Sequence, residues 1–90
     1  MTFEWDEGKD DSNLIKHGVS FDEAPTVLND PLYVDFYDPD HLENENRYLI
    51  IGESSQGRLL IVSYTERGNK NRLISARETT KSERRMYEEG

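Results

Sequence analysis

The chain has 90 residues and no cysteine, so it can form one small domain but neither a disulfide bond nor a thiolate metal site. Its formal net charge of −8 argues, for the chain as a whole, against nucleic-acid binding. The charge is unevenly distributed, because residues 1–46 carry 13 acidic and two basic side chains, whereas residues 47–90 carry six acidic and nine basic ones. This asymmetry indicates an acidic surface on one side and an anion-tolerant surface on the other. The alternative is that the charge varies along the chain without forming separate surfaces.

We expect a single domain over residues 1–90, since no linker, internal repeat or low-complexity tract interrupts the sequence. The longest aliphatic run, residues 59–62, is far too short to span a membrane. The first residues lack the basic and apolar stretches of a signal peptide. A cytoplasmic protein is therefore the expectation.

A first helix is predicted over residues 6–17. Asp6 is suited to the N-cap, and Gly18 occupies the position where glycine commonly ends a helix. Leu14 and Ile15 are the clearly apolar residues of this segment, so its amphipathic pattern is weak.

A second helix is predicted to begin at Ser20, because Ser20 and Glu23 form an S-x-x-E capping box. Pro25 lies inside this helix and removes one backbone hydrogen bond, which predicts a short or distorted helix. Residues 29–31 end it.

Four strands follow, as the hydrophobic period changes to the alternation of a β-strand. They are predicted over residues 32–37, 48–51, 58–65 and 72–76. Short turns join the last three, so consecutive strands are expected to pair in antiparallel fashion. Residues 38–46 are read as a polar loop.

A C-terminal helix is predicted to begin at Thr80, which forms a second capping box with Glu83, and to reach Glu89. An alternative cap, Ser75 with Glu78, would start the helix earlier. The expected fold class is α+β, with two N-terminal helices, a four-stranded antiparallel sheet and a C-terminal helix. We expect the helices to cover one face of the sheet and leave the other partly open as a concave site.

Arginine dominates the basic residues of the second half. The seven arginines are Arg47, Arg58, Arg67, Arg72, Arg77, Arg84 and Arg85. Guanidinium groups match phosphate oxygens with planar donors, so several of them on one sheet face would hold an RNA backbone and stabilise a pentacoordinate phosphorane. The alternative is that each arginine is neutralised at the surface by its own acid, above all Arg84 and Arg85 on the terminal helix.

Strand alternation constrains which arginines share a face. Arg77 has the parity of Ser75, whereas Arg72 has the parity of Ile74. Unbroken alternation therefore predicts Arg72 and Arg77 on opposite faces, and it leaves open which face meets the helices.

Histidine offers few candidates for proton transfer or metal binding. His17 lies at the predicted end of the first helix, where it is either a general acid or base or a structural group near the helix dipole. The polar loop could bind a cation weakly, but its spacing does not match an EF-hand. Its candidate ligands are Asp38, Asp40, Glu43 and Glu45, whereas His41 is expected to be solvated. No metal or other cofactor is expected.

Aromatic residues could contact a base. Trp5 precedes the first helix and is either a lid on the core or a stacking platform, and Tyr64 is either a core residue or a stacking one. The sequence carries no Gly-rich phosphate loop and no nucleophile elbow.

Sequence blocks along nearly the whole chain resemble the BrnT toxins of bacterial type II toxin–antitoxin systems. The blocks are Phe3-Glu4-Trp5-Asp6-Glu7, Asn13, residues 16–24 (KHGVSFDEA), Asp30-Pro31, Ile51-Gly52, Gly57-Arg58, residues 64–68 (YTERG), residues 74–77 (ISAR), Glu83-Arg84 and Tyr87. The KHGVSF block together with ISAR at this spacing is the most specific part of the resemblance.

The resemblance implies a RelE-like fold and a metal-independent ribonuclease that inhibits translation. It also implies a partner similar to BrnA, an antitoxin with a ribbon-helix-helix DNA-binding part. Such a complex would repress its own operon, with operator DNA contacted only through the antitoxin.

In such a ribonuclease the 2′-hydroxyl attacks the adjacent phosphate while arginines neutralise the developing charge. On this sequence the expected phosphate and transition-state ligands are Arg58, Arg67 and Arg77. The general base is expected to be Glu53 or Glu66, with His17 as a further candidate. RNA-binding roles are expected for Arg72, Trp5, Tyr64 and Lys70.

A second hypothesis is a non-catalytic interaction module, in which the acidic N-terminal half docks a basic partner. It predicts that RNA stays intact in the presence of the protein.

Overall fold

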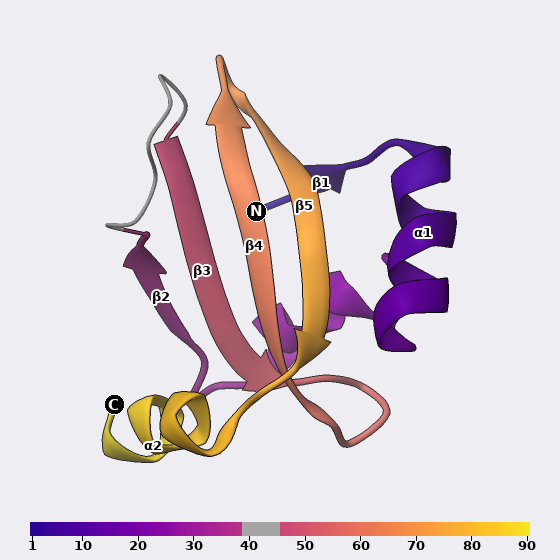
Figure 1. The fold of residues 1–90 in the computed structure, drawn as a ribbon. Coiled ribbons are helices and arrows are strands. Elements are labelled where there is room, and N and C mark those ends of the chain that lie inside the picture. The colour runs from indigo at the N-terminus through magenta and orange to yellow at the C-terminus, as the bar shows by residue number, and fades with distance from the viewer. Residues whose placement is uncertain (39–45) are drawn as a thin grey trace.

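The computed structural model describes residues 1–38 and 46–90, which are built around a five-stranded sheet (Figure 1). The strands are β1 (Phe3–Glu4), β2 (Val34–Tyr37), β3 (Asn46–Glu53), β4 (Leu59–Arg67) and β5 (Lys70–Glu78). Their spatial order is β1-β5-β4-β3-β2, with β1 parallel to β5 and the other neighbours antiparallel. The α+β class is confirmed, but the prediction of four antiparallel strands is wrong because the sheet is mixed.

The additional strand, β1, is too short to be recognised from its own sequence. Its two residues pair with β5, Phe3 with Asn71 and Glu4 with Arg72. Two residues cannot display an alternating pattern, so this strand exists only because the edge of β5 offers hydrogen-bond partners.

The first predicted helix is confirmed as α1 (Glu7–His17). The Asp6 carboxylate accepts a hydrogen bond from the backbone N–H of Lys9 at 3.1 Å, as an N-cap does. At the other end Gly18 adopts a left-handed conformation with φ of 72°, and its N–H bonds to the carbonyl of Leu14. Glycine is suited to this position because it has no Cβ to clash.

The second predicted helix is corrected to a shorter 3-10 helix, η1 (Ala24–Asn29). The hydroxyl of Ser20 accepts from the N–H of Glu23 as the capping box predicts, at 3.1 Å. The carboxylate of Glu23 does not complete the box, because it bonds to Ser54 and Arg58 instead. Pro25 occupies the first turn, where a missing N–H costs little.

The C-terminal helix is confirmed as α2 (Lys81–Glu89), with both hydrogen bonds of the Thr80–Glu83 capping box present. The alternative start at Ser75 is wrong, because Ser75 belongs to β5. No helix of the described residues is long and apolar enough to cross a membrane.

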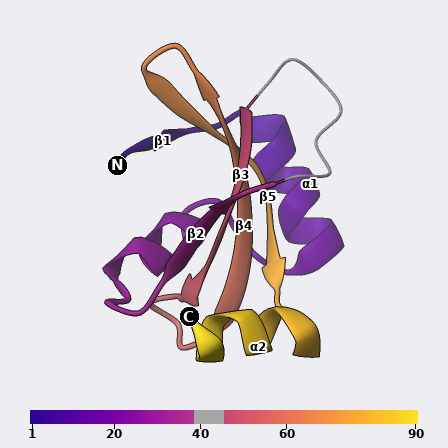
Figure 2. The same ribbon diagram turned by 90° about the vertical axis from the view of Figure 1, so that its left-hand side faces the viewer.

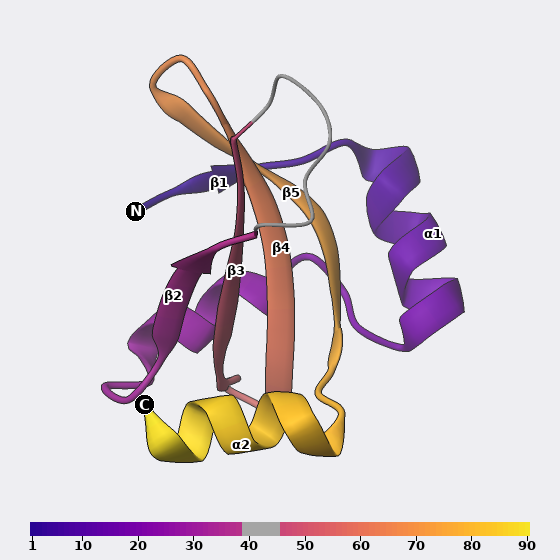
Figure 3. The ribbon, with the colours of Figure 1, turned by 60° about the vertical axis from the view of Figure 1, so that its left-hand side comes forward.

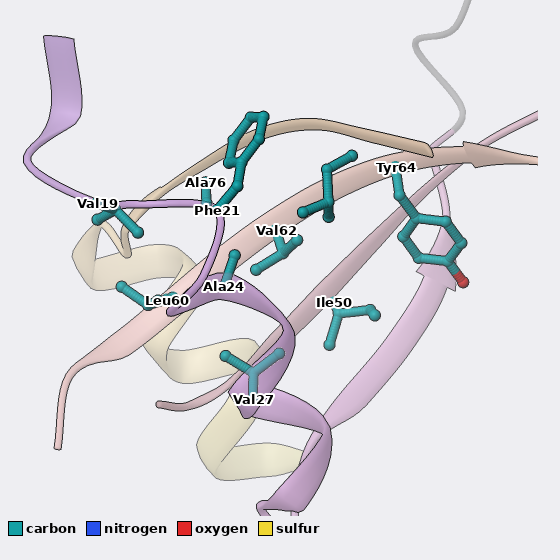
Figure 4. Close-up of a cluster of buried hydrophobic side chains, with 10 residues drawn as sticks. Val19, Phe21, Ala24, Val27, Ile50, Leu60, Val62, Tyr64 and Ala76 are labelled. Atoms are coloured by element: carbon teal, nitrogen blue, oxygen red, sulfur yellow. The ribbon is translucent and has the colours of Figure 1, made fainter. Parts of the chain in front are cut away.

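The helices lie on both sides of the sheet rather than on one. Seen nearly edge on, the sheet has η1 on one side and α1 and α2 on the other (Figure 2). The larger core fills the η1 side, where Phe21, Val27, Ile50 and Leu60 are fully buried (Figure 4). The expectation that all helices cover one face is therefore wrong, and both faces carry a core.

The smaller core lies between the sheet and α2. Ile51 and Ile61 are buried there beside Tyr87 of α2. The hydroxyl of Tyr87 donates to the carboxylate of Asp30 at 2.6 Å, which raises the pKa of Tyr87 to about 12.

Helix α2 crosses beneath the strands, while α1 lies beside β5 (Figure 3). On the sheet face that carries α2, no described helix covers the upper part of the strands (Figure 1).

Asn13 fixes the position of α1. Its side chain is buried, and its amide donates to the carbonyls of Val19 and Ala76, both at 2.8 Å. Its amide oxygen accepts from the N–H of Ala76 at 3.1 Å. The side chain thereby replaces a neighbouring strand along the free edge of β5, and it joins α1 to the sheet by three hydrogen bonds.

Replacing Asn13 with alanine is expected to lower the free energy of unfolding by at least about 2 kcal/mol, because it leaves three buried backbone groups without partners. Urea denaturation followed by circular dichroism measures the change. Ser12→Ala, at an exposed neighbouring position, is the control and should leave stability nearly unchanged. An N13A variant as stable as the parent would show that α1 is held by other contacts.

Candidate functional site

The sheet face on the side of α1 and α2 gathers basic side chains from three strands. We call it the arginine face, and it comprises Arg47, Arg67, Lys70, Arg72 and Arg77. Residues opposite each other in a sheet point to the same side. Arg47 and Arg72 both face Thr65 of β4, and Arg67 faces Lys70. Arg77 faces Ile61, which belongs to the smaller core beside α2. The register therefore places these five cations on one side.

A β-bulge produces this arrangement. The pairing of β4 with β5 shifts at Ser63 and Tyr64, so that Ser63 faces Ser75 but Tyr64 faces Leu73. Ile74 is the extra residue of β5, and it reverses the alternation between Arg72 and Arg77. The prediction that these two arginines lie on opposite faces is therefore wrong.

Arg77 is held by α2. Its two Nη atoms donate to the two carboxylate oxygens of Glu83, both at 2.8 Å, and Nη1 also donates to the carbonyl of Glu78 at 3.2 Å. This bidentate contact raises the pKa of Arg77 and lowers the pKa of Glu83. The Arg77 side chain remains 39% exposed, so the guanidinium is fixed in orientation yet accessible.

Arg72 is held more loosely from the other end of the face. Its Nε lies 3.5 Å from Glu4 of β1, and Lys70 Nζ lies 3.8 Å from the same carboxylate. These distances are ion-pair contacts rather than good hydrogen bonds. The Glu4 carboxylate is thus shared by Arg72 and Lys70.

Arg47 and Arg72 flank Thr65, which is 1% exposed. The Nε atoms of both arginines are buried, and neither makes a hydrogen bond within the described residues. Burial of these atoms restricts how each side chain can turn.

Acidic side chains of the same strands point mostly to the η1 side. Asp35 accepts from the Tyr64 hydroxyl, Glu66 accepts from the Tyr48 hydroxyl, and Glu78 faces Leu60 of the larger core. The sheet therefore separates charge by side, so a chain of net charge −8 presents a locally basic face.

Arg58 does not join the arginine face, and the predicted convergence of Arg58 with Arg67 and Arg77 is wrong. Its Nε donates to Glu23 at 3.1 Å, its Nη2 donates to the other oxygen of that carboxylate, and Nη2 also donates to the carbonyl of Gly18 at 3.1 Å. The contact with Arg58 lowers the pKa of Glu23 and raises that of Arg58. Arg58 thus ties the start of β4 to the segment before η1.

The two expected general bases lie on opposite sides of the sheet. Glu66 accepts from Tyr48 on the η1 side at 3.0 Å, away from the arginine face. Glu53 faces Leu59 of the smaller core, so it lies on the side of the arginine face, at the end of β3. It borders a pocket near Thr26 and Asp30, and its N–H donates to Asp30 at 2.8 Å.

The expected stacking residues are part of the larger core. Trp5 packs edge-on against Phe21, with ring centroids 6.2 Å apart. Tyr64 is 4% exposed and stacks on Tyr48, and its hydroxyl donates to Asp35 at 3.2 Å. Figure 4 shows Tyr64 among the buried side chains of this core. Burial raises the pKa of Tyr64, and the adjacent Asp35 carboxylate adds to this effect. Neither ring is available to a base at the arginine face.

His17 lies beside the arginine face in a groove between α1 and β5. We call this the α1 groove, and its volume is about 280 Å³. It is lined by Lys9, Ser12, Asn13, Lys16, His17, Ile74 and Ser75. Ser75 faces Ser63 in the sheet and so belongs to both the groove and the arginine face.

No cluster of three or more metal-ligating side chains occurs within residues 1–38 and 46–90. The weak cation site expected around Asp38 depends on Asp40, Glu43 and Glu45, which lie outside the described residues, as does His41.

Arg47 was named among the seven arginines of the sequence, but no phosphate-binding or RNA-binding role was predicted for it. Along β3, Arg47 points to the same side as Leu49 and Ile51, and Ile51 belongs to the smaller core. This parity was available in the sequence, but the side of the sheet on which it lies required the fold.

Two comparisons with known proteins give the same result. A family model described as "Ribonuclease toxin, BrnT, of type II toxin-antitoxin system" matches residues 5–83. The crystal structure of the Brucella abortus ribonuclease toxin BrnT is similar, with a TM-score of 0.65 and 25% sequence identity, covering 90% of this chain and 99% of that one. No curated protein sequence matches the chain.

Replacing Arg58 with methionine is expected to lower the free energy of unfolding by about 3 kcal/mol at pH 7, because Glu23 is left as a buried carboxylate without its cation. The Glu23 pKa is lowered in the fold, so its contribution is complete above its ordinary value of 4.5 and is lost as the pH falls through the folded value. The difference between R58M and the parent should therefore shrink at pH 4. Urea denaturation at both pH values measures it, with R85M on exposed α2 as the control, and an equal loss at both would contradict the role of Glu23.

Proposed function

Because this chain belongs to the BrnT family of ribonuclease toxins of type II toxin–antitoxin systems, we propose that its arginine face binds and cleaves RNA. The observation that carries this proposal is the bulge at Ile74, which brings Arg72 and Arg77 to the same side as Arg47. A face with several fixed guanidiniums suits a phosphodiester, since each guanidinium offers planar donors that keep their charge near neutral pH.

The proposed reaction needs no metal ion. The ribose 2′-oxygen attacks the adjacent phosphorus, the bond from phosphorus to the 5′-oxygen breaks, and a 2′,3′-cyclic phosphate and a 5′-hydroxyl result. The 2′-hydroxyl loses a proton to a base, and the leaving 5′-oxygen gains one. Arg72, Arg77 and Arg47 would supply the positive charge that stabilises the phosphorane, which is the task a metal ion has in other nucleases.

His17 is the side chain we propose for proton transfer. It lies in the α1 groove with Ser75, and Ser75 also lies on the arginine face. Imidazole exchanges protons near neutral pH more readily than other side chains. Glu66 is less suited, because its carboxylate accepts from Tyr48 on the η1 side. Glu53 is less suited because it borders a pocket with Thr26 and Asp30 rather than the α1 groove.

We further propose that the partner is a BrnA-like antitoxin with a ribbon-helix-helix part, and that the complex represses its own operon. In that arrangement the antitoxin contacts the operator and the toxin acts on cytoplasmic RNA. The description of the family as toxins of type II toxin–antitoxin systems supports an antitoxin partner.

Purified protein is expected to cleave RNA in the presence of a chelator and to leave 2′,3′-cyclic phosphate ends. R72Q and R77Q should each lower the cleavage rate by about 100-fold or more, because each removes a preorganised donor to the developing charge. Analysis of RNA ends and single-turnover rates measures both effects.

The matched controls are R85Q, which neutralises an exposed arginine of α2, and R58M, assayed below its unfolding temperature. Both should cleave at the parental rate. Loss of activity with chelator would indicate a metal-dependent enzyme, whereas intact RNA under all conditions would favour the non-catalytic interaction module.

Replacing His17 with alanine is expected to lower the cleavage rate by about 100-fold or more, since general acid–base catalysis contributes that much. Affinity for RNA in which every 2′-hydroxyl is methylated, and which therefore cannot be cleaved, should change little. An H17A variant that cleaves at the parental rate would remove His17 from the mechanism.

A further inference from the structure

We propose that the α1 groove is a second RNA subsite, which holds the nucleotide next to the one being cleaved. This inference rests on the proposed function, because it extends the RNA path from the arginine face onto α1. It assigns a substrate-binding role to Lys9 and Lys16.

The lysines of the acidic half of the chain occupy unusual positions. Residues 1–46 contain 13 acidic side chains and two basic ones, Lys9 and Lys16, and both line the α1 groove. The spacing of seven residues brings them to one side of α1. If lysines were present only for solubility, nothing would require both to border the same groove.

Neither lysine has an acidic partner in the part of the chain that the structure describes. By contrast Lys70, Arg72 and Arg77 each contact a carboxylate. Glu7 and Asp11 are exposed on α1, and Asp10 is engaged by the N–H of Phe21 at 2.8 Å. Two ammonium groups left without counterions, in a chain with 19 acidic side chains, favour an anion supplied from outside.

The position of the helix that carries these lysines is fixed. The three hydrogen bonds of Asn13 hold α1 against the edge of β5, and they use both the donors and the oxygen of the amide. Asn13 therefore positions the groove and does not itself bind the ligand. Rotation of α1 that would carry Lys9 and Lys16 away from the groove would break those bonds.

The chemistry of the groove matches a nucleotide. Ile74, the extra residue of the bulge, contributes an apolar surface, while Ser12 and Ser75 contribute hydroxyls. The lysines supply charge for the phosphates on either side of the nucleotide, the apolar surface can contact a base or ribose, and the hydroxyls can accept or donate hydrogen bonds. An inorganic anion would need only the charge.

The groove is continuous with the arginine face. Ser75 lines the groove and also faces Ser63 in the row next to that of Arg72. The same bulge that turns Arg72 and Arg77 to one side presents Ile74 to α1. One RNA strand can therefore pass from the arginine face into the groove without crossing to the other side of the sheet.

The test is the salt dependence of binding to 2′-O-methylated RNA, which cannot be cleaved. Each phosphate contact with a single strand contributes about 0.7 to the slope of log K against log salt concentration, so K9Q/K16Q should reduce the slope by about 1.4. The double variant K81Q/R85Q removes the same charge and should leave the slope unchanged. Lys81 and Arg85 are exposed, and helical geometry directs them away from Glu83 and Tyr87.

The outcomes separate this inference from the proposed function. A parental slope in folded K9Q/K16Q, with RNA still bound, overturns the subsite alone. Equal reductions in K9Q/K16Q and K81Q/R85Q also overturn it, because they indicate a response to net charge. RNA binding that is absent in the parent, or unchanged in R72Q/R77Q, overturns the proposed use of the arginine face. Circular dichroism and the urea midpoint of each variant confirm folding.

Discussion

One extra residue in β5 determines the functional geometry of this protein. The bulge at Ile74 reverses the alternation of side chains along the strand, so Arg72 and Arg77, five positions apart, point to the same side. Without it, one of the two would point into the larger core, where a guanidinium would lack partners and water. The bulge is next to the anchor of α1, because Asn13 bonds to the backbone of Ala76 two residues later.

The ion pairs of the molecule fall into two kinds. Arg58 pairs with the buried carboxylate of Glu23, which also accepts from Ser54, and this contact fastens the start of β4 to the segment before η1. Arg77 and Glu83 form a pair that leaves the guanidinium partly exposed on a sheet face. The first pair uses its charge to hold the fold together, whereas the second orients a charge that remains accessible.

The acidity of the chain and its RNA chemistry are compatible because the sheet separates charge. Asp35, Glu66 and Glu78 point to the η1 side, while the arginine face meets Glu4 and Glu83. The field that a bound phosphate experiences is dominated by nearby groups, since distant exposed charges are screened within about 8–10 Å at physiological salt. Net charge therefore describes the whole surface and not the site.

Helices α1 and α2 and the strands β2 to β5 could be read from the amino-acid sequence, because capping and alternation are properties of neighbouring residues. Asp6 and Gly18 delimit α1, Thr80 and Glu83 begin α2, and the alternating segments become β2 to β5. Blocks such as KHGVSF also pointed to the family, and most residues of the arginine face were named from the sequence. The pairing of β1 with the sheet, the contact of Glu23 with Arg58, and the position of Arg47 beside Arg72 could be known only from the folded chain. These features depend on strand register and on contacts between residues far apart in the chain, and a single inserted residue changes both without a local signature.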